Sequence, residues 1–295
     1  MGANLKEVRG RIASVKSTIQ ITKAMKMVSA AKLKRATDRI VQIRPYADQL
    51  SNVLQNLVGN LQGEVSISYG KQREGNKVLI VVITSDKGLC GGFNANAIKA
   101  AKNLLADKYA SLNEAKKVDV LTIGKRAYEA FKDGKNYVNR DFVELFHNLN
   151  FEDTSKAAEY IMYAFDQGVY DKVEVVYGKF KNAGTQLTTV EQFLPISTST
   201  ENTNAKINAD YIFEPSQVEI LEGLVPKILK TQFFRYLLDS NASEHGARMT
   251  AMDKATENAN ELLKTLNIMY NRARQAAITT ELSEIVSGAA ALSNE

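Results

Sequence analysis

The sequence predicts an α/β fold in which two long terminal helices pair as an antiparallel coiled coil and flank an inserted α/β domain. Three observations predict it. Proline, the strongest helix breaker, occurs only from residue 45 to residue 226 of the 295-residue chain. Apolar residues near both ends recur in alternating steps of three and four, the spacing of a coiled-coil seam. Between the ends, short β-branched runs alternate with helical patterns, as in a doubly wound, mainly parallel sheet.

The N-terminal segment, residues 1–58, is predicted to be one coiled-coil helix. Nine of the twelve positions in its three-four alternation are apolar. The twelve positions are Leu5, Val8, Ile12, Val15, Ile19, Thr22, Lys26, Ser29, Leu33, Ala36, Ile40 and Ile43. Asn4, with Glu7 three residues later, resembles a capping box that satisfies free N–H groups at a helix start. The stripe is narrow, so it requires a partner helix.

The C-terminal segment, residues 216–292, is predicted to be that partner. Eight of the nine positions in its alternation are apolar. The nine positions are Met252, Ala255, Ala259, Leu262, Leu266, Met269, Ala273, Ala276 and Thr280. Ser216 with Glu219 gives a second capping-box pattern. We expect Pro226 to kink or break this helix early, so that its regular part starts after the proline.

The middle of the chain, residues 70–208, is predicted to be the α/β domain. The predicted strands are 77–84, 118–124, 172–180 and a more exposed strand at 185–195, and the predicted helices lie near 95–110, 125–132 and 153–168. Residues 196–208 are polar without a clear period, which is typical of a loop.

The stretch SDKGLCGGFN (85–94) follows the first predicted strand and precedes a helix, where phosphate-binding loops occur. Its glycines, Gly88, Gly91 and Gly92, match neither G-x-x-x-x-G-K-[ST] nor G-x-G-x-x-G. Backbone geometry therefore explains them better than nucleotide binding. Cys90 is a candidate nucleophile at a helix start, but no histidine partner is evident. An enzyme with helical arms remains a weaker alternative.

The charge distribution indicates an anionic partner. The chain carries a net charge of +5, and residues 1–44 hold eleven Lys and Arg against Glu7 and Asp38. Nucleic acid, a lipid surface or an acidic protein would fit such a segment, although a solvated helix face is the plain alternative. Aromatic residues that could stack on bases are missing there, which disfavours nucleic acid. His147 and His245 lie far apart, so no zinc site is expected.

The N-terminal apolar stripe is interrupted at Thr22, Lys26 and Ser29, while neighbouring positions are apolar. This pattern, at Ile21, Met25 and Val28, predicts that the coil locally changes which face it buries. Local repacking within a plain coiled coil is one interpretation. The other is that Met25 and the surrounding lysines face an acidic protein surface.

Six stretches of this sequence resemble the γ subunit family of F-type ATP synthase. They are ITKAMKMVSAAKLKRA (21–36), RPYA (44–47), SDKGLCGGFN (85–94), DYIFEP (210–215), ASEHGARMTAMDKATENA (242–259) and YNRARQAAITTELSEIVSGAAAL (270–292). They follow the family's order and spacing over nearly the full length, whereas residues 100–205 match mainly in texture. Gly246 occupies a position where the family has alanine, and inside a helix it costs about 1 kcal/mol relative to Ala.

The resemblance implies a central rotor stalk, a long coiled coil with a Rossmann-like domain, and no active site or cofactor of its own. The implied partners are the α and β subunits of an α3β3 hexamer, the ε subunit and the membrane c-ring, with one copy of this chain per complex. No nucleic acid partner and no membrane span of its own are implied. With no transit peptide in view, the resemblance implies a peripheral protein on the cytoplasmic side of the bacterial inner membrane.

The resemblance also implies roles for individual residues. Those implied to contact the β subunits are Lys23, Met25, Lys26, Lys87, Arg274 and Gln275. Those implied to form the foot on the c-ring are Tyr211, Phe213 and Glu214. The apolar end of the chain is implied to be a bearing that turns without deep interlocking.

Overall fold

The computed structural model describes residues 5–60, 68–70, 73, 77–196 and 217–292. The chain divides into two compact units. The first comprises residues 1–28 and 249–295, and the second comprises residues 29–248. Two long helices, α1 (Leu5–Asn60) and α6 (Gln217–Leu292), contribute to both units. The division into segments 1–58, 70–208 and 216–292 that the sequence suggests stays a prediction.

In the second unit, the described residues form one five-stranded sheet. The strands are β1 (Val78–Ile83), β2 (Val118–Ile123), β3 (Val138–Asn139), β4 (Lys172–Asn182) and β5 (Thr185–Leu194). Their order is β3-β2-β1-β4-β5, and every neighbouring pair is parallel except β4 with β5. The predicted mainly parallel sheet and its four longer strands are confirmed, whereas the two-residue β3 was not predicted.

The remaining elements of the second unit are mostly the crossovers between these strands. They are a 3₁₀ turn (Ser68–Gly70), α2 (Phe93–Asn103), a π-helical turn (Leu104–Lys108), α3 (Ala110–Glu114), α4 (Lys125–Phe131) and α5 (Phe151–Asp166). The helices predicted near 95–110, 125–132 and 153–168 are confirmed in outline. The polar stretch 196–208 lies, apart from Ile196, outside the described residues.

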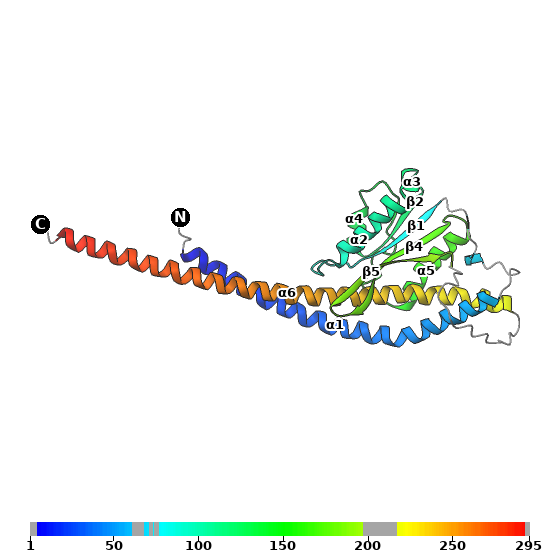
Figure 1. Cartoon of the computed structure of the whole chain (residues 1–295), viewed down its shortest axis with the longest axis horizontal. Helices are drawn as coiled ribbons and strands as arrows, with labels where there is room; N and C mark the ends of the chain where they lie inside the picture. The colour runs from blue at the N-terminus through cyan, green and yellow to red at the C-terminus, as the bar shows by residue number, and fades with distance from the viewer. Residues whose placement is uncertain (1–4, 61–67, 71–72, 74–76, 197–216, 293–295) are drawn as a thin grey trace. The chain divides into compact units, whose positions relative to one another are not determined.

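Each face of the sheet carries its own apolar core because strand residues alternate between the two faces. Val78, Ile80 and Val82 pack with Ala101 of α2 and Phe131 of α4. The alternate residues of β1 pack on the other face against α5 and against residues 225–237 of α6. Figure 1 shows α2 and α4 on one side of the sheet and α6 on the other. The long helix α6 is therefore part of the core of the α/β unit.

Strand β4 continues past the last residue of β1 that pairs with it, and α6 completes its hydrogen bonds. Val176 is the last β4 residue paired with β1. Two residues on, the Gly178 N–H donates to Ser240 Oγ and the Gly178 carbonyl accepts from Ser243 Oγ, both at 3.0 Å. A Cβ at Gly178 would lie 2.5 Å from the Phe93 ring and 3.2 Å from Ser243 Cβ. Glycine is needed here because helix, strand and ring meet so closely.

Both long helices contain a proline. Pro45 lies inside α1 and Pro226 lies inside α6. The prediction that the regular part of the C-terminal helix starts after Pro226 is wrong, because α6 begins at Gln217. A proline removes one backbone N–H from the ladder, while burial of Val225, Ile228 and Leu229 in the sheet core keeps the flanking turns in place. The capping residues Asn4 and Ser216 lie outside the described residues.

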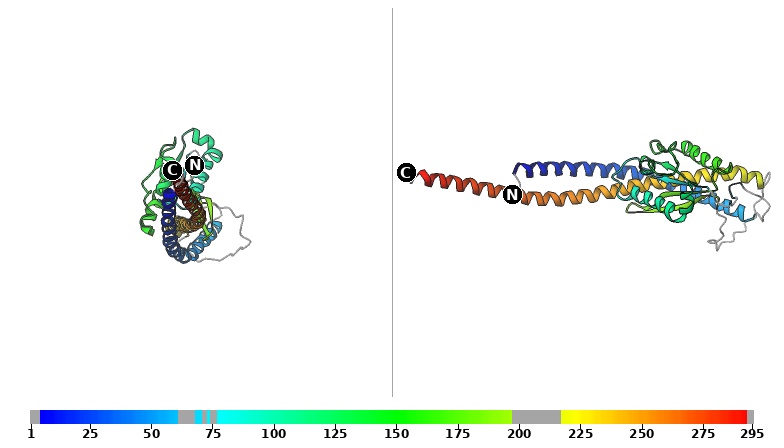
Figure 2. Two further views of the ribbon diagram at one scale, coloured as in Figure 1. Left: turned by 90° about the vertical axis from the view of Figure 1, so that its left-hand side faces the viewer. Right: turned by 90° about the horizontal axis from the view of Figure 1, so that it is seen from above.

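In the first unit, α1 and α6 form an antiparallel pair. Arg9 bonds to Tyr270, Thr22 to Thr256 and Lys26 to Asp253, so the partner numbers fall along α6 as they rise along α1. Figure 2 shows the two helices side by side and α6 continuing past the N-terminal end of α1. The predicted antiparallel coiled coil is confirmed.

The predicted seam of α1 is buried or half-buried at every one of its twelve positions. The prediction of which α6 residues form the seam is partly wrong. Leu262 and Met269 are 49% and 48% exposed, whereas their neighbours Leu263 and Tyr270 are half-buried. Starting from Met252, the observed seam alternates spacings of four and three residues, whereas the predicted seam alternates three and four. The two seams have every seventh residue in common, so the seven-residue period of the sequence does not distinguish between them.

Candidate functional site

A polar layer lies between α1 and α6 in the first unit. Thr22 and Thr256 are only 8% and 7% exposed, and the Thr256 hydroxyl donates to Thr22 Oγ1 at 2.8 Å. The Thr22 hydroxyl in turn donates to the Ile19 carbonyl at 3.1 Å. One turn along, Lys26 Nζ lies 2.5 Å from Asp253 Oδ1. These contacts satisfy the polar groups inside the seam.

This layer overturns the prediction that the coil locally buries a different face. Thr22 and Ser29 are buried, whereas Ile21 and Val28 are each 56% exposed. The threonine hydroxyls remain inside because each finds a hydrogen-bond partner there, so the helix has no need to rotate. Ile21, Ala24 and Val28 are therefore left as an exposed apolar stripe on α1, beside Met27, which is 71% exposed.

The three candidate residues on α1 occupy one helical turn next to this stripe. Lys23 is exposed, and Met25 and Lys26 are half-buried. The Lys26 ammonium pairs with Asp253. The other lysine of this turn, Lys23, does not pair with that carboxylate. The segment offers an apolar stripe edged by a cation, which suits a partner surface that combines apolar and acidic groups.

The candidates Arg274 and Gln275 lie exposed on α6, one turn beyond Tyr270. Arg9 Nη2 donates to the Tyr270 hydroxyl at 3.0 Å, and its guanidinium carbon lies 5.9 Å from the ring centroid. Arg9, and to a smaller degree Arg274, lower the pKa of the Tyr270 hydroxyl. This pair links the two helices one turn before Arg274.

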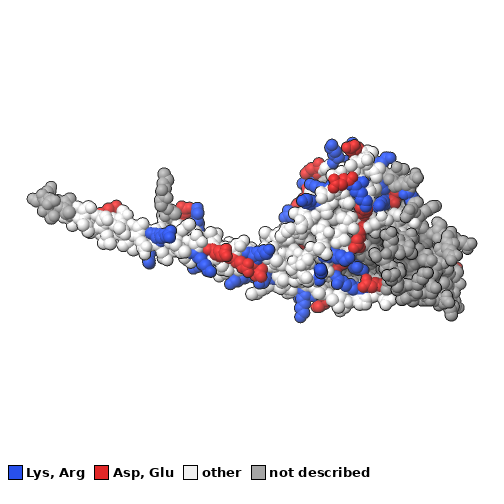
Figure 3. All heavy atoms as spheres, in the orientation of Figure 1, with Lys and Arg blue, Asp and Glu red and all other residues white. Residues whose placement is uncertain are grey.

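Beyond Gln275 the described part of α6 is exposed throughout. Its large exposed apolar side chains are Ile278, Leu282, Ile285 and Val286, at 49–68%. Glu281 and Glu284 are the charged residues between 276 and 289. Figure 3 shows this end of the helix as mostly uncharged, next to a charged stretch of the pair.

Lys87 belongs to the second unit, in the glycine loop that follows β1. Its side chain is exposed. Leu89 and Gly91 have φ angles of +62° and +57°, so the loop needs left-handed conformations at two places. Asn94 Oδ1 accepts from the Ser85 N–H at 2.9 Å, and the Ser85 hydroxyl donates to the Lys87 carbonyl at 2.7 Å. Short local bonds therefore hold the loop in one shape.

Two backbone N–H groups at the start of α4, the helix that follows β2, are already bonded to residues that follow β1. The Lys125 N–H at the start of α4 donates to Asp86 Oδ1 at 3.0 Å, and the Ala127 N–H donates to Thr84 Oγ1 at 2.8 Å. A carboxylate at this helix start repels a phosphate and occupies the N–H that would bind it. This geometry disfavours the nucleotide-binding alternative.

Arg248 ties the glycine loop to α6. Its Nη2 donates to the carbonyls of Lys87 and Gly88 at 3.1 and 3.3 Å. Its Nη1 donates to Glu244 Oε1 at 2.5 Å, and both side chains of this ion pair are only 10% exposed. Burial, together with Arg248 and Lys32, lowers the pKa of the adjacent His245 to about 4. Sequence reasoning missed Arg248 and Glu244, and their spacing of four residues on a helix was the available signal.

The remaining candidates cannot be placed. Tyr211, Phe213 and Glu214 lie outside the described residues. Within the described ranges, no three or more His, Cys, Asp and Glu side chains are grouped to hold a metal ion. Nor does any helix there combine the length and apolar character that crossing a bilayer requires.

Comparisons with known proteins agree over nearly the whole chain. The profile of a family described as ATP synthase matches residues 4–292. The ATP synthase gamma chain of Cytophaga hutchinsonii is 56% identical over 293 residues, which is 99% of each chain. The ATP synthase gamma chain of Flavobacterium johnsoniae is 53% identical over 290 residues, 98% of this chain and 99% of the relative.

Solved structures give the same picture. A chain of the Tetrahymena thermophila mitochondrial ATP synthase central stalk and c-ring is 27% identical, with a TM-score of 0.56 over 80% of this chain and 99% of that chain. A chain of the Euglena gracilis mitochondrial ATP synthase has a TM-score of 0.66 over 98% of this chain and 94% of that chain. Its identity is 21%, so this likeness shows the fold.

Proposed function

The chain belongs to the ATP synthase gamma chain family, and from this premise we propose that it is the central rotor stalk of a bacterial F1Fo ATP synthase. It couples ion-driven rotation of the membrane c-ring to conformational cycling of the catalytic β subunits, in ATP synthesis and in hydrolysis. The gamma chain is a non-catalytic subunit. The observation that carries the proposal is the 56% identity to a bacterial gamma chain over 99% of both chains.

The first unit supports a role inside a ring of other subunits. The end of α6 exposes an apolar, almost uncharged surface, and an exposed apolar surface of this kind marks a contact with another protein. Small and apolar side chains contact a surrounding wall without directional bonds, so the helix can turn within it. We propose that the α and β subunits of an α3β3 hexamer form that wall.

The candidate residues of the first unit, together with Lys87, supply the contacts that transmit torque. We propose that Arg274 and Gln275, both exposed, engage loops of the β subunits. Lys23, Met25 and Lys26 contact an acidic segment of β, and Lys87 is a further contact to that segment. The exposed apolar stripe beside Lys23 supports this assignment.

The remaining proposals concern the c-ring, the ε subunit, the copy number and the attachment to the membrane. Tyr211, Phe213 and Glu214 contact the c-ring, and the α/β unit binds the ε subunit. One copy of the chain serves each complex. The bacterial origin of the two gamma chains compared above supports peripheral attachment to the cytoplasmic side of the inner membrane.

ATPase assays on reconstituted complexes test the proposal. Purified α and β subunits from the same source are assayed with and without this chain, and the chain is assayed alone. We expect the chain alone to be inactive and the assembled complex to show rapid multi-site turnover. Replacing Arg274 and Gln275 with alanine should lower that turnover by about tenfold or more, because two torque-bearing contacts are removed.

The matched control is Lys264→Ala, which removes an exposed side chain on the same helix. It should leave turnover unchanged. Nucleotide hydrolysis by the chain alone, with no response to α and β, would contradict the rotor assignment and make the glycine loop an active site.

A further inference from the structure

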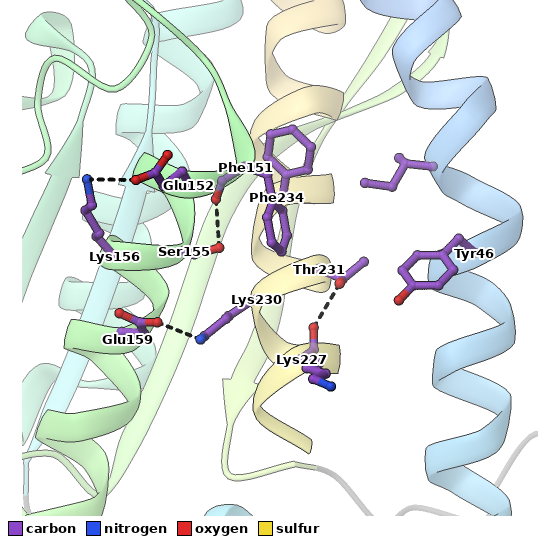
Figure 4. Close-up of a pocket in the computed structure, with 11 residues that line it drawn as sticks. Tyr46, Phe151, Glu152, Ser155, Lys156, Glu159, Lys227, Lys230, Thr231 and Phe234 are labelled. Carbon is purple, nitrogen blue, oxygen red and sulfur yellow. Dashed lines mark hydrogen bonds and ion pairs between the residues drawn. The ribbon is translucent and has the colours of Figure 1, made fainter. Parts of the chain in front are cut away.

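A pocket of about 790 Å³ opens between α1, α5 and α6 in the second unit. Its apolar walls come from all three helices: Ile43 and Tyr46 on α1, Phe151 on α5 and Phe234 on α6. Phe151 and Phe234 meet edge to face, with ring centroids 5.5 Å apart. Figure 4 shows Tyr46 facing α6 across the pocket from Thr231 and Lys227. The volume falls within the range of small-molecule sites.

Most polar groups around this pocket already have partners. Lys230 Nζ lies 2.6 Å from Glu159 Oε1, and Lys156 pairs with Glu152 and Asp153. The Thr231 hydroxyl donates to the Lys227 carbonyl at 2.8 Å, as Figure 4 shows. The Ser155 hydroxyl likewise donates to the backbone of its own helix. These groups have little capacity left for a ligand.

Lys227 differs from the other two lysines of the pocket. Its side chain is exposed, and its ammonium forms no ion pair with the described residues. The pocket therefore offers a large aromatic and aliphatic surface and one available cation. From this geometry we propose a binding site for an amphiphilic organic monoanion, whose apolar body packs on Phe151, Phe234 and Tyr46 and whose carboxylate pairs with Lys227.

The same lining excludes other ligand classes. A nucleotide or sugar carries many donors and acceptors, and burying them against Phe151 and Phe234 would leave them unpaired. A cationic amphiphile would meet Lys227 with like charge. A carboxylate on an alkyl or aromatic body matches both the apolar wall and the single cation. The site is independent of the proposed rotor contacts, since it involves none of their residues.

Calorimetric titration of the full-length chain with decanoate tests the site. Decyltrimethylammonium, of the same chain length and opposite charge, and AMP are the comparison ligands. We expect decanoate to bind at a ratio of one, and to bind at least about fivefold more tightly than the cation. Lys227→Met should weaken decanoate about fivefold, the size of one exposed ion pair.

Two further variants make the test specific. Phe151→Ala removes a ring that is 47% exposed, so the fold tolerates it, and binding should weaken by about tenfold. Lys264→Met, elsewhere on α6, should leave binding unchanged. Equal affinity for the cation, insensitivity to Lys227→Met, or no binding would overturn the proposal. So would loss of decanoate binding in the assembled complex, because the pocket would then be a protein interface.

Discussion

Arg248 serves two partners with one guanidinium. Its Nη1 donates to the buried Glu244 carboxylate, and its Nη2 donates to two carbonyls of the glycine loop. The bonds of Ser85 and Asn94 hold the glycine loop locally, and the two bonds from Arg248 attach that loop to α6 next to Lys87.

Removing this arginine should destabilise the second unit strongly. We expect Arg248→Met to lower the free energy of unfolding by about 3 kcal/mol or more, because Glu244 is left as an uncompensated buried charge. Urea denaturation followed by circular dichroism measures the change. The double variant Arg248→Met with Glu244→Gln should recover part of the loss. Equal stability of the single variant and the wild type would show that the ion pair is not coupled to folding.

His245 makes the stability of the same region depend on pH. Burial beside Arg248 and Lys32 lowers its pKa in the folded chain to about 4, against about 6.5 when unfolded. The unfolded state therefore binds more protons between these values, and stability is lost as pH falls through that window. Burial raises the pKa of the neighbouring Glu244, so this carboxyl also contributes to the pH dependence of stability. Comparing the wild type with His245→Gln isolates the contribution of the histidine. The wild type should lose on the order of 3 kcal/mol relative to this variant between pH 7 and pH 4. Parallel pH curves would contradict the shift.

At the level of elements, the cross-helix ion pair of the first unit is a modest contributor. Lys26 and Asp253 side chains are 42% and 47% exposed, so water screens their attraction. A double-mutant cycle with Lys26→Ala and Asp253→Ala should give a coupling energy of no more than about 1 kcal/mol, declining at high salt. Thermal denaturation at two salt concentrations measures it. A larger coupling energy that does not change with salt concentration would mean that Lys26 and Asp253 behave as a buried ion pair.

The sequence predicted the elements better than the faces that they bury. Strand β1 is a continuous apolar run, and such a run is buried whichever way it is placed, so its prediction was secure. For α6, whether Leu262 or Leu263 is buried depends on a small rotation of the helix about its axis, and packing against α1 determines that rotation. For α1, the predicted seam is buried even at Thr22, because the Thr22 hydroxyl accepts a hydrogen bond from Thr256 across the interface. Such a pairing depends on register, and no single segment contains that information.

At the scale of the whole molecule, the candidate site was predictable only where short motifs carry it. The exposure of Lys23, Arg274 and Gln275 agrees with a role in binding partners, but their targets lie on other chains. Asp253 and Arg248 were missed for the opposite reason. Each acts inside this chain, across a contact between segments that are more than a hundred residues apart. The folded structure was needed to bring those segments together.

The exposed end of α6 yields the last prediction. Leu282 and Ile285 lie on one side of the helix and are 57% and 68% exposed. Neither contributes to the core, so the double variant Leu282→Lys with Ile285→Lys should change the stability of the isolated chain by no more than about 0.5 kcal/mol. If the α and β subunits cover this surface, two buried charges would instead weaken assembly severely.

Size-exclusion chromatography of reconstituted complexes, with ATPase activity of the recovered fraction, measures that effect. The comparison variant is Thr280→Lys with Ser287→Lys, which adds the same charge to the opposite side of the same turns. If the surrounding subunits contact every side of this helix, the comparison variant should also weaken assembly. A static partner that covers only one side would tolerate it. Equal loss in both variants therefore supports a surrounding bearing, and selective loss in the first points to a one-sided contact.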